Sequence, residues 1–289
     1  MKRSIRYSLS TTEQDSFAKA CDASDFNSVE ETDQKKLLEI ATVQAKLAAQ
    51  ETPNLAQNVR YLRNLRNSPG LIVLEHLPKV KDPRLLILIV GSILGAVDRE
   101  ANEGDYVIPI KEQQTKPGER PSFKTAGVFY FHTDLSYAPN PPLFLLMHSV
   151  VNNLGEGGLS LFADIEVVIK KLSALDIAEL QKPQFLFPAP PHYRGGGVVQ
   201  FPILTQSTED EVWRLRFRRD NLRAETRTGM EAVVQLIKAI NDSHEEVMLE
   251  TDSLVLLDNQ SFLHGRTAFA GGGQNAKEPR HLNRIYVGM

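Results

Sequence analysis

Two polar side chains close an apolar run near the middle of the chain. Residues 127–139 read GVFYFHTDLSYAP, so an aromatic segment ends in His132 and Asp134 with one residue between them. In an extended strand, side chains at positions i and i+2 project from the same face. A buried carboxylate is costly unless it is paired or binds a cation. The two residues therefore form either a local ion pair at the end of a strand or half of a metal site.

A second apolar segment supplies another histidine. Residues 254–269, LVLLDNQSFLHGRTAF, turn at polar residues and then present His264. Two histidines and one carboxylate make the facial triad of non-haem Fe(II) oxygenases, which leaves coordination positions open for other ligands. A structural zinc site is closed by four ligands, and the single cysteine, Cys21, offers no cluster that could close one. The pattern favours a catalytic iron site.

Two arginines stand close together near the C-terminus. The segment EPRHLNRIYVG, at 278–288, places Arg280 and Arg284 four residues apart, so on a strand they share a face. Guanidinium groups hold carboxylates through paired hydrogen bonds. The alternative is a surface strand with two solvated arginines, but the apolar IYV that follows and the nearby His264 weaken it. We therefore expect these arginines to bind carboxylates beside the metal.

The order of these motifs resembles one family of enzymes. HxD at 132–134, DNxxxxHxR at 258–266 and RxxxR at 280–284 are similar to the TauD/TfdA branch of the Fe(II)- and 2-oxoglutarate-dependent dioxygenases, and to the clavaminate-synthase-like amino-acid hydroxylases. The segment GEGGLSLFADI, at 155–165, also matches the glycine pair, hydroxyl residue and apolar strand that follow the first metal motif in that family. The resemblance covers about residues 105–289.

The resemblance implies iron ligands and a reaction. The ligands would be His132, Asp134 and His264, and the cosubstrates would be 2-oxoglutarate and O2, with succinate and CO2 released as a C–H bond is hydroxylated. Asp134 also bears on the type of reaction, because related halogenases have a small residue in place of this carboxylate. Its presence favours hydroxylation, or a desaturation variant, over halogenation.

The resemblance also implies residues that bind the cosubstrate. Arg280 would form a salt bridge with the distal carboxylate of 2-oxoglutarate, and Ser160, where relatives often have threonine, would hydrogen-bond the same carboxylate. Arg284 would contact the substrate carboxylate or the other end of the cosubstrate. Arg266, two residues after the last iron ligand, is a further candidate for the carboxylate region.

The substrate is less closely defined by the sequence. Residues 106–127 are polar, contain proline and glycine, and are typical of a loop that closes over an active site. Within this loop Glu112, Gln113 and Gln114 could hold an amine or amide. From the resemblance we expect a free amino acid or a similar small metabolite. The alternatives are a desaturase, a metal-binding jelly-roll enzyme that is not an oxygenase, and a catalytically silent binding module.

A basic segment offers a possible contact for an anionic substrate. Residues 211–223 place Arg214, Arg216 and Arg218 on one face of a strand, opposite an apolar face. The simpler interpretation is a solvated basic face. In the other, one of the arginines reaches the substrate.

The elements that must position these residues follow from the hydrophobic pattern. The first 104 residues are mostly helical, and from 105 on, short apolar runs separated by proline and glycine indicate strands of a sandwich or barrel. With the resemblance, this predicts a mainly β fold in one domain, 1–289, with a double-stranded β-helix (jelly-roll) core and helices that brace one sheet. The expected helices are 11–22, 33–49, 54–66, one that starts at Pro83, 164–181 and 229–250, with a strand at 70–77.

Composition narrows the protein class. Of the 289 residues, 42% are hydrophobic and 24% charged, and the net charge of −3 does not suggest a nucleic-acid partner. The apolar run 85–97 is too short to span a bilayer, so we expect a buried helix and no membrane partner. No secretory signal is evident, and one cysteine fits a reducing compartment. We expect a cytoplasmic enzyme with a small-molecule substrate. The oligomeric state is left open.

Overall fold

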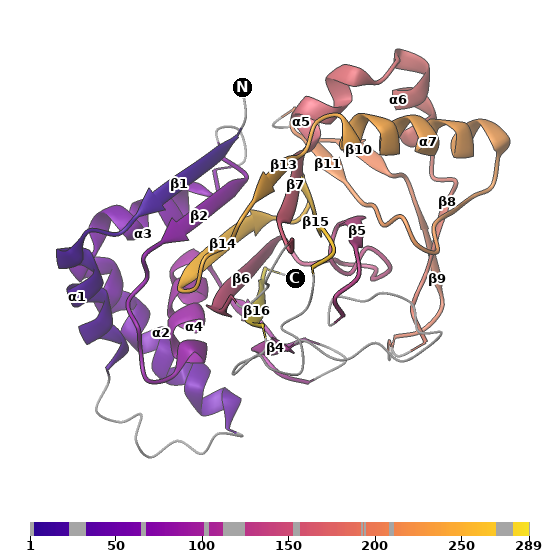
Figure 1. Cartoon of the computed structure of the whole chain (residues 1–289). Helices are drawn as coiled ribbons and strands as arrows, with labels where there is room; N and C mark the ends of the chain where they lie inside the picture. The colour runs from indigo at the N-terminus through magenta and orange to yellow at the C-terminus, as the bar shows by residue number, and fades with distance from the viewer. Residues whose placement is uncertain are drawn as a thin grey trace.

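Two β-sheets face each other in the computed structural model of the chain (Figure 1). The structure describes residues 3–22, 33–64, 68–100, 104–111, 125–152, 157–191, 193, 195–207, 211–269 and 280–288. The larger sheet has the strand order β1-β2-β14-β6-β16-β3, with β4 also paired to β16, and the smaller has the order β13-β7-β15-β5. The predicted mainly β jelly-roll fold is confirmed.

The larger sheet combines strands from the whole length of the chain. Only its β1–β2 pair is parallel, and every other pairing is antiparallel. Strand β1 was not predicted from the sequence, because it lies at the sheet edge and has only partly buried side chains. The bounds are β1 Ser4–Ser8, β2 Leu71–Glu75, β3 Val97–Asp98, β4 Ile108–Lys111, β6 Phe144–Val151, β14 Ser253–Asp258 and β16 His281–Val287.

The smaller sheet holds His132 at the end of β5 and His264 within β15. Its bounds are β5 Phe129–His132, β7 Ser160–Asp164, β13 Glu245–Val247 and β15 Phe262–Arg266, and all its pairings are antiparallel. Alternate residues of the two sheets meet between them in one apolar cluster, which includes Leu145, Val255 and Tyr286 from the larger sheet and Phe162 and Phe262 from the smaller.

Four helices cover the outer face of the larger sheet: α1 Thr11–Cys21, α2 Gln34–Glu51, α3 Pro53–Tyr61 and α4 Pro83–Leu94. The expected buried helix is α4, which starts at Pro83 after the cap Asp82. It packs closely on β16, since a Cβ at Gly91 would lie 2.4 Å from the Ile285 side chain. Among the described residues, none of the helices has both the length and the apolar character that crossing a membrane requires.

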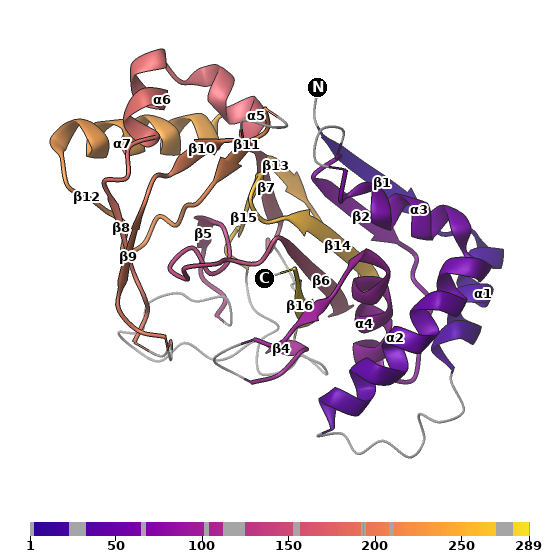
Figure 2. The same ribbon diagram turned by 180° about the vertical axis from the view of Figure 1, so that it is seen from behind.

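A second helical layer covers the smaller sheet, so helices brace both sheets and not one as expected (Figure 2). The predicted helix 164–181 is three pieces, because Ser173 starts a new capping box after the second piece. The predicted helix 229–250 ends at Asn241, where apolar side chains stop recurring, and residues 245–247 form β13 instead. The bounds are α5 Ile165–Val168, the 3₁₀ turn η2 Ile169–Lys171, α6 Ala174–Leu180 and α7 Arg227–Asn241.

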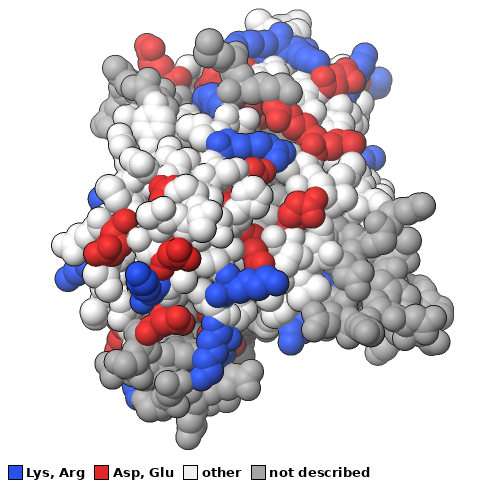
Figure 3. All heavy atoms as spheres, turned by 60° about the vertical axis from the view of Figure 1, so that its left-hand side comes forward, with Lys and Arg blue, Asp and Glu red and all other residues white. Residues whose placement is uncertain are grey.

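The remaining strands form two small sheets beside this layer. Strands β12 Arg223–Ala224, β8 Phe185–Pro188 and β9 Val198–Phe201 make one, and β10 Leu204–Gln206 and β11 Trp213–Leu215 make the other. On the opposite side of the molecule, the face shown in Figure 3, described basic and acidic side chains are interspersed.

Candidate iron site

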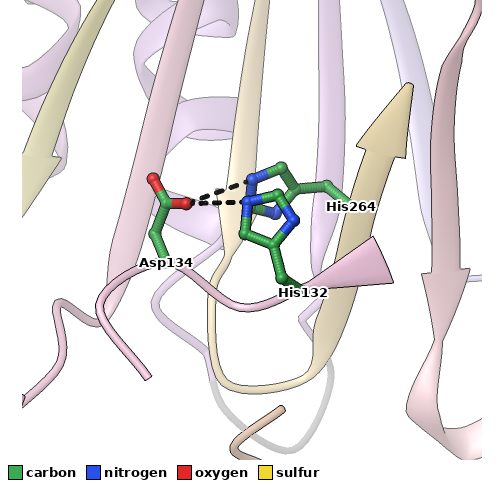
Figure 4. A group of neighbouring side chains, drawn as sticks. All are labelled: His132, Asp134 and His264. Carbon is green, nitrogen blue, oxygen red and sulfur yellow. Dashed lines mark ion pairs between the residues drawn. The ribbon is translucent and has the colours of Figure 1, made fainter. Parts of the chain in front are cut away.

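Strand register brings the two histidines together. In the β5–β15 pair, His132 lies directly opposite His264, and Asp134 follows two residues after the end of β5. Oδ1 of Asp134 lies 3.1 Å from Nε2 of His132 and 3.4 Å from Nε2 of His264 (Figure 4). One ligand atom from each residue lies within 4.8 Å of the others, and all three side chains are buried. These are the donors of an iron facial triad, so the residues fit the metal.

The backbone around the triad is held by hydrogen bonds. Nδ1 of His132 lies 2.8 Å from the Tyr130 carbonyl, and as the donor there it leaves the Nε2 lone pair free to face the metal. The side-chain oxygen of Asn259 accepts from the Asp134 amide at 2.7 Å, and its Nδ2 donates to the Asp134 and Pro142 carbonyls. The buried side chain of Thr133 bonds the backbone of Phe217 instead of facing the metal.

The electrostatics keep Asp134 and His264 in their metal-binding forms. Burial alone would raise the pKa of Asp134, but the charge of Arg284 and the hydrogen bonds with both histidines hold it well below its ordinary value. Burial, with the nearby His132, lowers the pKa of His264 to about 4. A carboxylate and a neutral imidazole are the forms that bind a metal ion.

The outer oxygen of Asp134 has its own partners. Tyr286 donates its hydroxyl to Oδ2 at 2.8 Å, and Arg284 donates Nη1 to the same oxygen at 3.2 Å. Burial raises the pKa of Tyr286 well above its ordinary value, so the phenol stays a donor. Sequence reasoning found neither Tyr286 nor Asn259. The available signals were the DN dipeptide and the position of Tyr286, two residues beyond Arg284 on the same strand face.

A cavity opens beside the triad, between the two sheets. The arginines and the serine expected to bind the cosubstrate all line it, together with apolar side chains from both sheets. Besides the triad its lining residues are Ile110, Phe129, Met147, Ser160, Phe162, Leu249, Gly265, Arg266, Arg280, Leu282 and Arg284. The cavity therefore combines cationic groups with walls that exclude water.

The lining arginines differ in their contacts. Arg266 lies opposite Ser160 in the β7–β15 register and donates Nη2 to the carbonyls of Thr125 and Gly127, the latter at 2.7 Å. The guanidinium carbons of Arg266 and Arg280 lie 4.6 and 5.9 Å from the ring centroid of Phe269. Arg266 thus ties the backbone before β5 to β15.

The basic segment does not form the solvated face considered from the sequence. Arg214 donates to the side chain of Gln260 at 2.8 Å, and Arg218 pairs with Asp220. Arg216 donates to the carbonyls of residues 136, 138 and 139, directly after the HxD motif. Arg216 therefore supports the loop that carries Asp134. The expected substrate contacts Glu112, Gln113 and Gln114 lie outside the described residues.

Comparison with known proteins identifies the family. Residues 34–286 match the model described as "Taurine catabolism dioxygenase TauD, TfdA family". The chain belongs to this family. The predicted class of enzyme, a 2-oxoglutarate-dependent dioxygenase that uses iron, is thereby confirmed, and the non-oxygenase and silent-module alternatives fall away.

Solved structures share the fold of this TauD/TfdA-family chain at low identity. An asparagine oxygenase complexed with Fe(II), (2S,3S)-3-hydroxyasparagine and succinate is 18% identical, with a TM-score of 0.84 over 98% of this chain and 93% of the other. The non-haem iron oxygenase OrfP with Fe and α-ketoglutaric acid is 17% identical, with a TM-score of 0.81 over 98% and 94%. OrfP with Fe, succinate and (3S)-hydroxy-L-Arg is 18% identical, with a TM-score of 0.78 over 98% and 93%.

Proposed function

We propose that this dioxygenase hydroxylates an unactivated C–H bond of a free amino acid or a closely similar metabolite, and converts 2-oxoglutarate and O2 to succinate and CO2. The observation that carries the proposal is the convergence of His132, Asp134 and His264 beside a cavity lined by arginines. Bound iron supplies the oxidising chemistry. Two structures that share the fold hold hydroxylated amino acids together with succinate.

Arg280 and Ser160 are the proposed partners of the distal carboxylate of 2-oxoglutarate. Both line the cavity, and both side chains are mostly buried. A guanidinium in a site with little water interacts strongly with a carboxylate. Arg266 has backbone carbonyls as partners, which supports a bracing role beside the cosubstrate.

Arg284 is proposed to recognise the carboxylate of the amino acid, because it lines the cavity beside the triad. Burial lowers the pKa of Arg284, but the acidic groups of Tyr286, Asp134 and Glu100 raise it above its ordinary value. An amino acid carries a carboxylate, and a buried guanidinium complements that group.

The proposed reaction is tested by succinate release with a panel of amino acids, which includes asparagine and arginine, and with small acids that lack the amino-acid backbone. The protein is reconstituted anaerobically with Fe(II) and 2-oxoglutarate and then exposed to O2. We expect one or a few amino acids to stimulate succinate formation and to gain one oxygen atom by mass spectrometry, with His132→Ala inactive. Stimulation only by compounds that lack an amino-acid backbone would overturn the substrate, and no succinate from folded, iron-loaded protein would overturn the reaction.

The cellular setting is part of the same proposal. The only cysteine, Cys21, is buried, and burial raises the pKa of its thiol to about 12, so it stays a packed thiol. This supports the cytoplasm as the compartment.

A further inference from the structure

The two oxygens of the Asp134 carboxylate have different surroundings. Oδ1 faces the Nε2 atoms of His132 and His264, where a metal ion would lie. Oδ2 points the other way and accepts hydrogen bonds from the Tyr286 hydroxyl at 2.8 Å and from Arg284 at 3.2 Å. The carboxylate therefore presents Oδ1 to the metal position, while Oδ2 already accepts hydrogen bonds from protein side chains.

Tyr286 is the more firmly placed of the two donors. Its side chain is 1% exposed, and its ring packs in the apolar cluster between the sheets. Its backbone is held from both sides, since Tyr286 is paired with Leu145 of β6 and with Asp98 of β3. Arg284 has a longer side chain that lines the cavity, where a bound carboxylate would compete for its hydrogen bonds. Tyr286, and not Arg284, is therefore the donor that can keep its hydrogen bond to Asp134 Oδ2 during catalysis.

The number of Asp134 oxygens on the metal matters in a site with three protein ligands. Carboxylates bind metal ions through one oxygen or through both. The open positions of a facial triad are needed by cosubstrate and O2, and a second Asp134 oxygen would take one of them. We propose that Tyr286 is a positioning residue that holds Oδ2 away from the metal and so keeps Asp134 a one-oxygen ligand. The inference rests on the proposed iron site and not on the identity of the substrate.

Tyr286→Phe tests this role, because it removes the hydroxyl and keeps the ring in the core. Partners of metal ligands typically contribute 10- to 100-fold to metal affinity. We expect Mn(II) to bind the metal-free variant about 10-fold more weakly in calorimetric titrations. We also expect at least a 10-fold weaker affinity of the Fe(II)-loaded variant for 2-oxoglutarate, measured anaerobically from the visible charge-transfer band. Tyr7→Phe is the matched control, since it removes a tyrosine hydrogen bond to Glu13 outside the site, and both affinities should stay at wild-type values.

The outcomes separate this role from a structural one and from failure of the site itself. Unchanged affinities in Tyr286→Phe, with or without a lower melting temperature, would overturn the positioning role. Wild-type Mn(II) affinity in His132→Ala would overturn the iron site on which it rests. If the variant does not fold, a crystal structure of the wild type with Zn(II) decides. We expect Oδ1 at about 2.0–2.2 Å from the metal and Oδ2 still bonded to Tyr286. Both oxygens on the metal would overturn the proposal.

Discussion

At the scale of single residues, the convergence of His132, Asp134 and His264 was predictable from the sequence, and the residues that support Asp134 were not. The spacing of His132 and Asp134 is local, so the sequence alone indicated that the two side chains lie near each other, although β5 ends at His132 and Asp134 follows it outside the strand. Asn259 and Tyr286 contact Asp134 across 125 and 152 residues of sequence. No periodicity within one segment reports such contacts, because they depend on which strands become neighbours.

Arg280 gives a residue-scale prediction about the cosubstrate. Removal of one partner of a buried charge pair costs about 2–5 kcal/mol, so Arg280→Ala is expected to raise KM for 2-oxoglutarate by roughly two orders of magnitude. Initial rates of succinate formation measure it. Arg227→Ala is the control, since Arg227 is exposed on α7 and pairs with Glu231, and its KM should match the wild type. A normal KM in Arg280→Ala would show that the distal carboxylate binds elsewhere.

His148 gives a residue-scale prediction about pH. It lies on the helix-facing side of β6, 2% exposed, and burial lowers its pKa to about 4 from an ordinary value of 6.5. The unfolded chain binds a proton at His148 more readily than the folded chain does. The contribution of the neutral His148 side chain to the free energy of unfolding is therefore fully present above pH 6.5 and is lost as the pH falls toward 4. The loss amounts to about 3 kcal/mol.

Denaturant unfolding of the metal-free protein between pH 4.5 and 7.5 measures this dependence. As the pH is lowered from 7.5 to 4.5, the free energy of unfolding should decrease less steeply in His148→Leu than in the wild type. His244→Gln is the control, because His244 lies in a more exposed turn and bonds the Asn241 carbonyl. An identical slope in wild type and His148→Leu would contradict the expectation.

At the scale of elements, the pairing register of β5 and β15 brings His132 and His264 together. The pairing is irregular between His264 and Arg266, and Gly265 lies at that point. A Cβ at Gly265 would lie 2.8 Å from the Phe129 carbonyl oxygen, so the two strands can approach this closely only with glycine there. The sequence showed the strands themselves, but strand periodicity carries no information about which residues of two distant strands are opposite.

Gly265→Ala is therefore expected to move β5 away from β15 and to separate the two histidines. We expect a loss of about 1–3 kcal/mol in unfolding free energy and at least a 10-fold loss of Mn(II) affinity. Gly91→Ala is the matched control, because its Cβ would crowd Ile285 on the far face of the larger sheet. It should lower stability with metal affinity unchanged. Equal metal affinity in the two variants would contradict the link between register and site.

At the scale of the whole molecule, the N-terminal third is part of the catalytic fold. The sequence resemblance covered about residues 105–289, whereas the family match starts at residue 34, and β1, β2 and β3 belong to the larger sheet. Helical periodicity predicted α1 to α4 but is shared by helices of every fold, so it could not assign them to this family. The single domain over 1–289 stays a prediction.

The site connects the two sheets, which gives a prediction about the stability of the whole molecule. His132, His264 and Ser160 belong to the smaller sheet, whereas Arg284 belongs to β16 of the larger sheet and Arg280 directly precedes it. Ligands that bind only the folded state stabilise it, by about 2.7 kcal/mol at a concentration 100-fold above Kd. For a chain of this size that corresponds to a rise in Tm of roughly 5 °C.

We expect Mn(II) to raise Tm, and 2-oxoglutarate to raise it further only when the metal is present. In Arg280→Ala the first rise should remain and the second should disappear, because the metal ligands are intact and the carboxylate partner is lost. A full second rise in that variant would show that 2-oxoglutarate does not join the two sheets through Arg280.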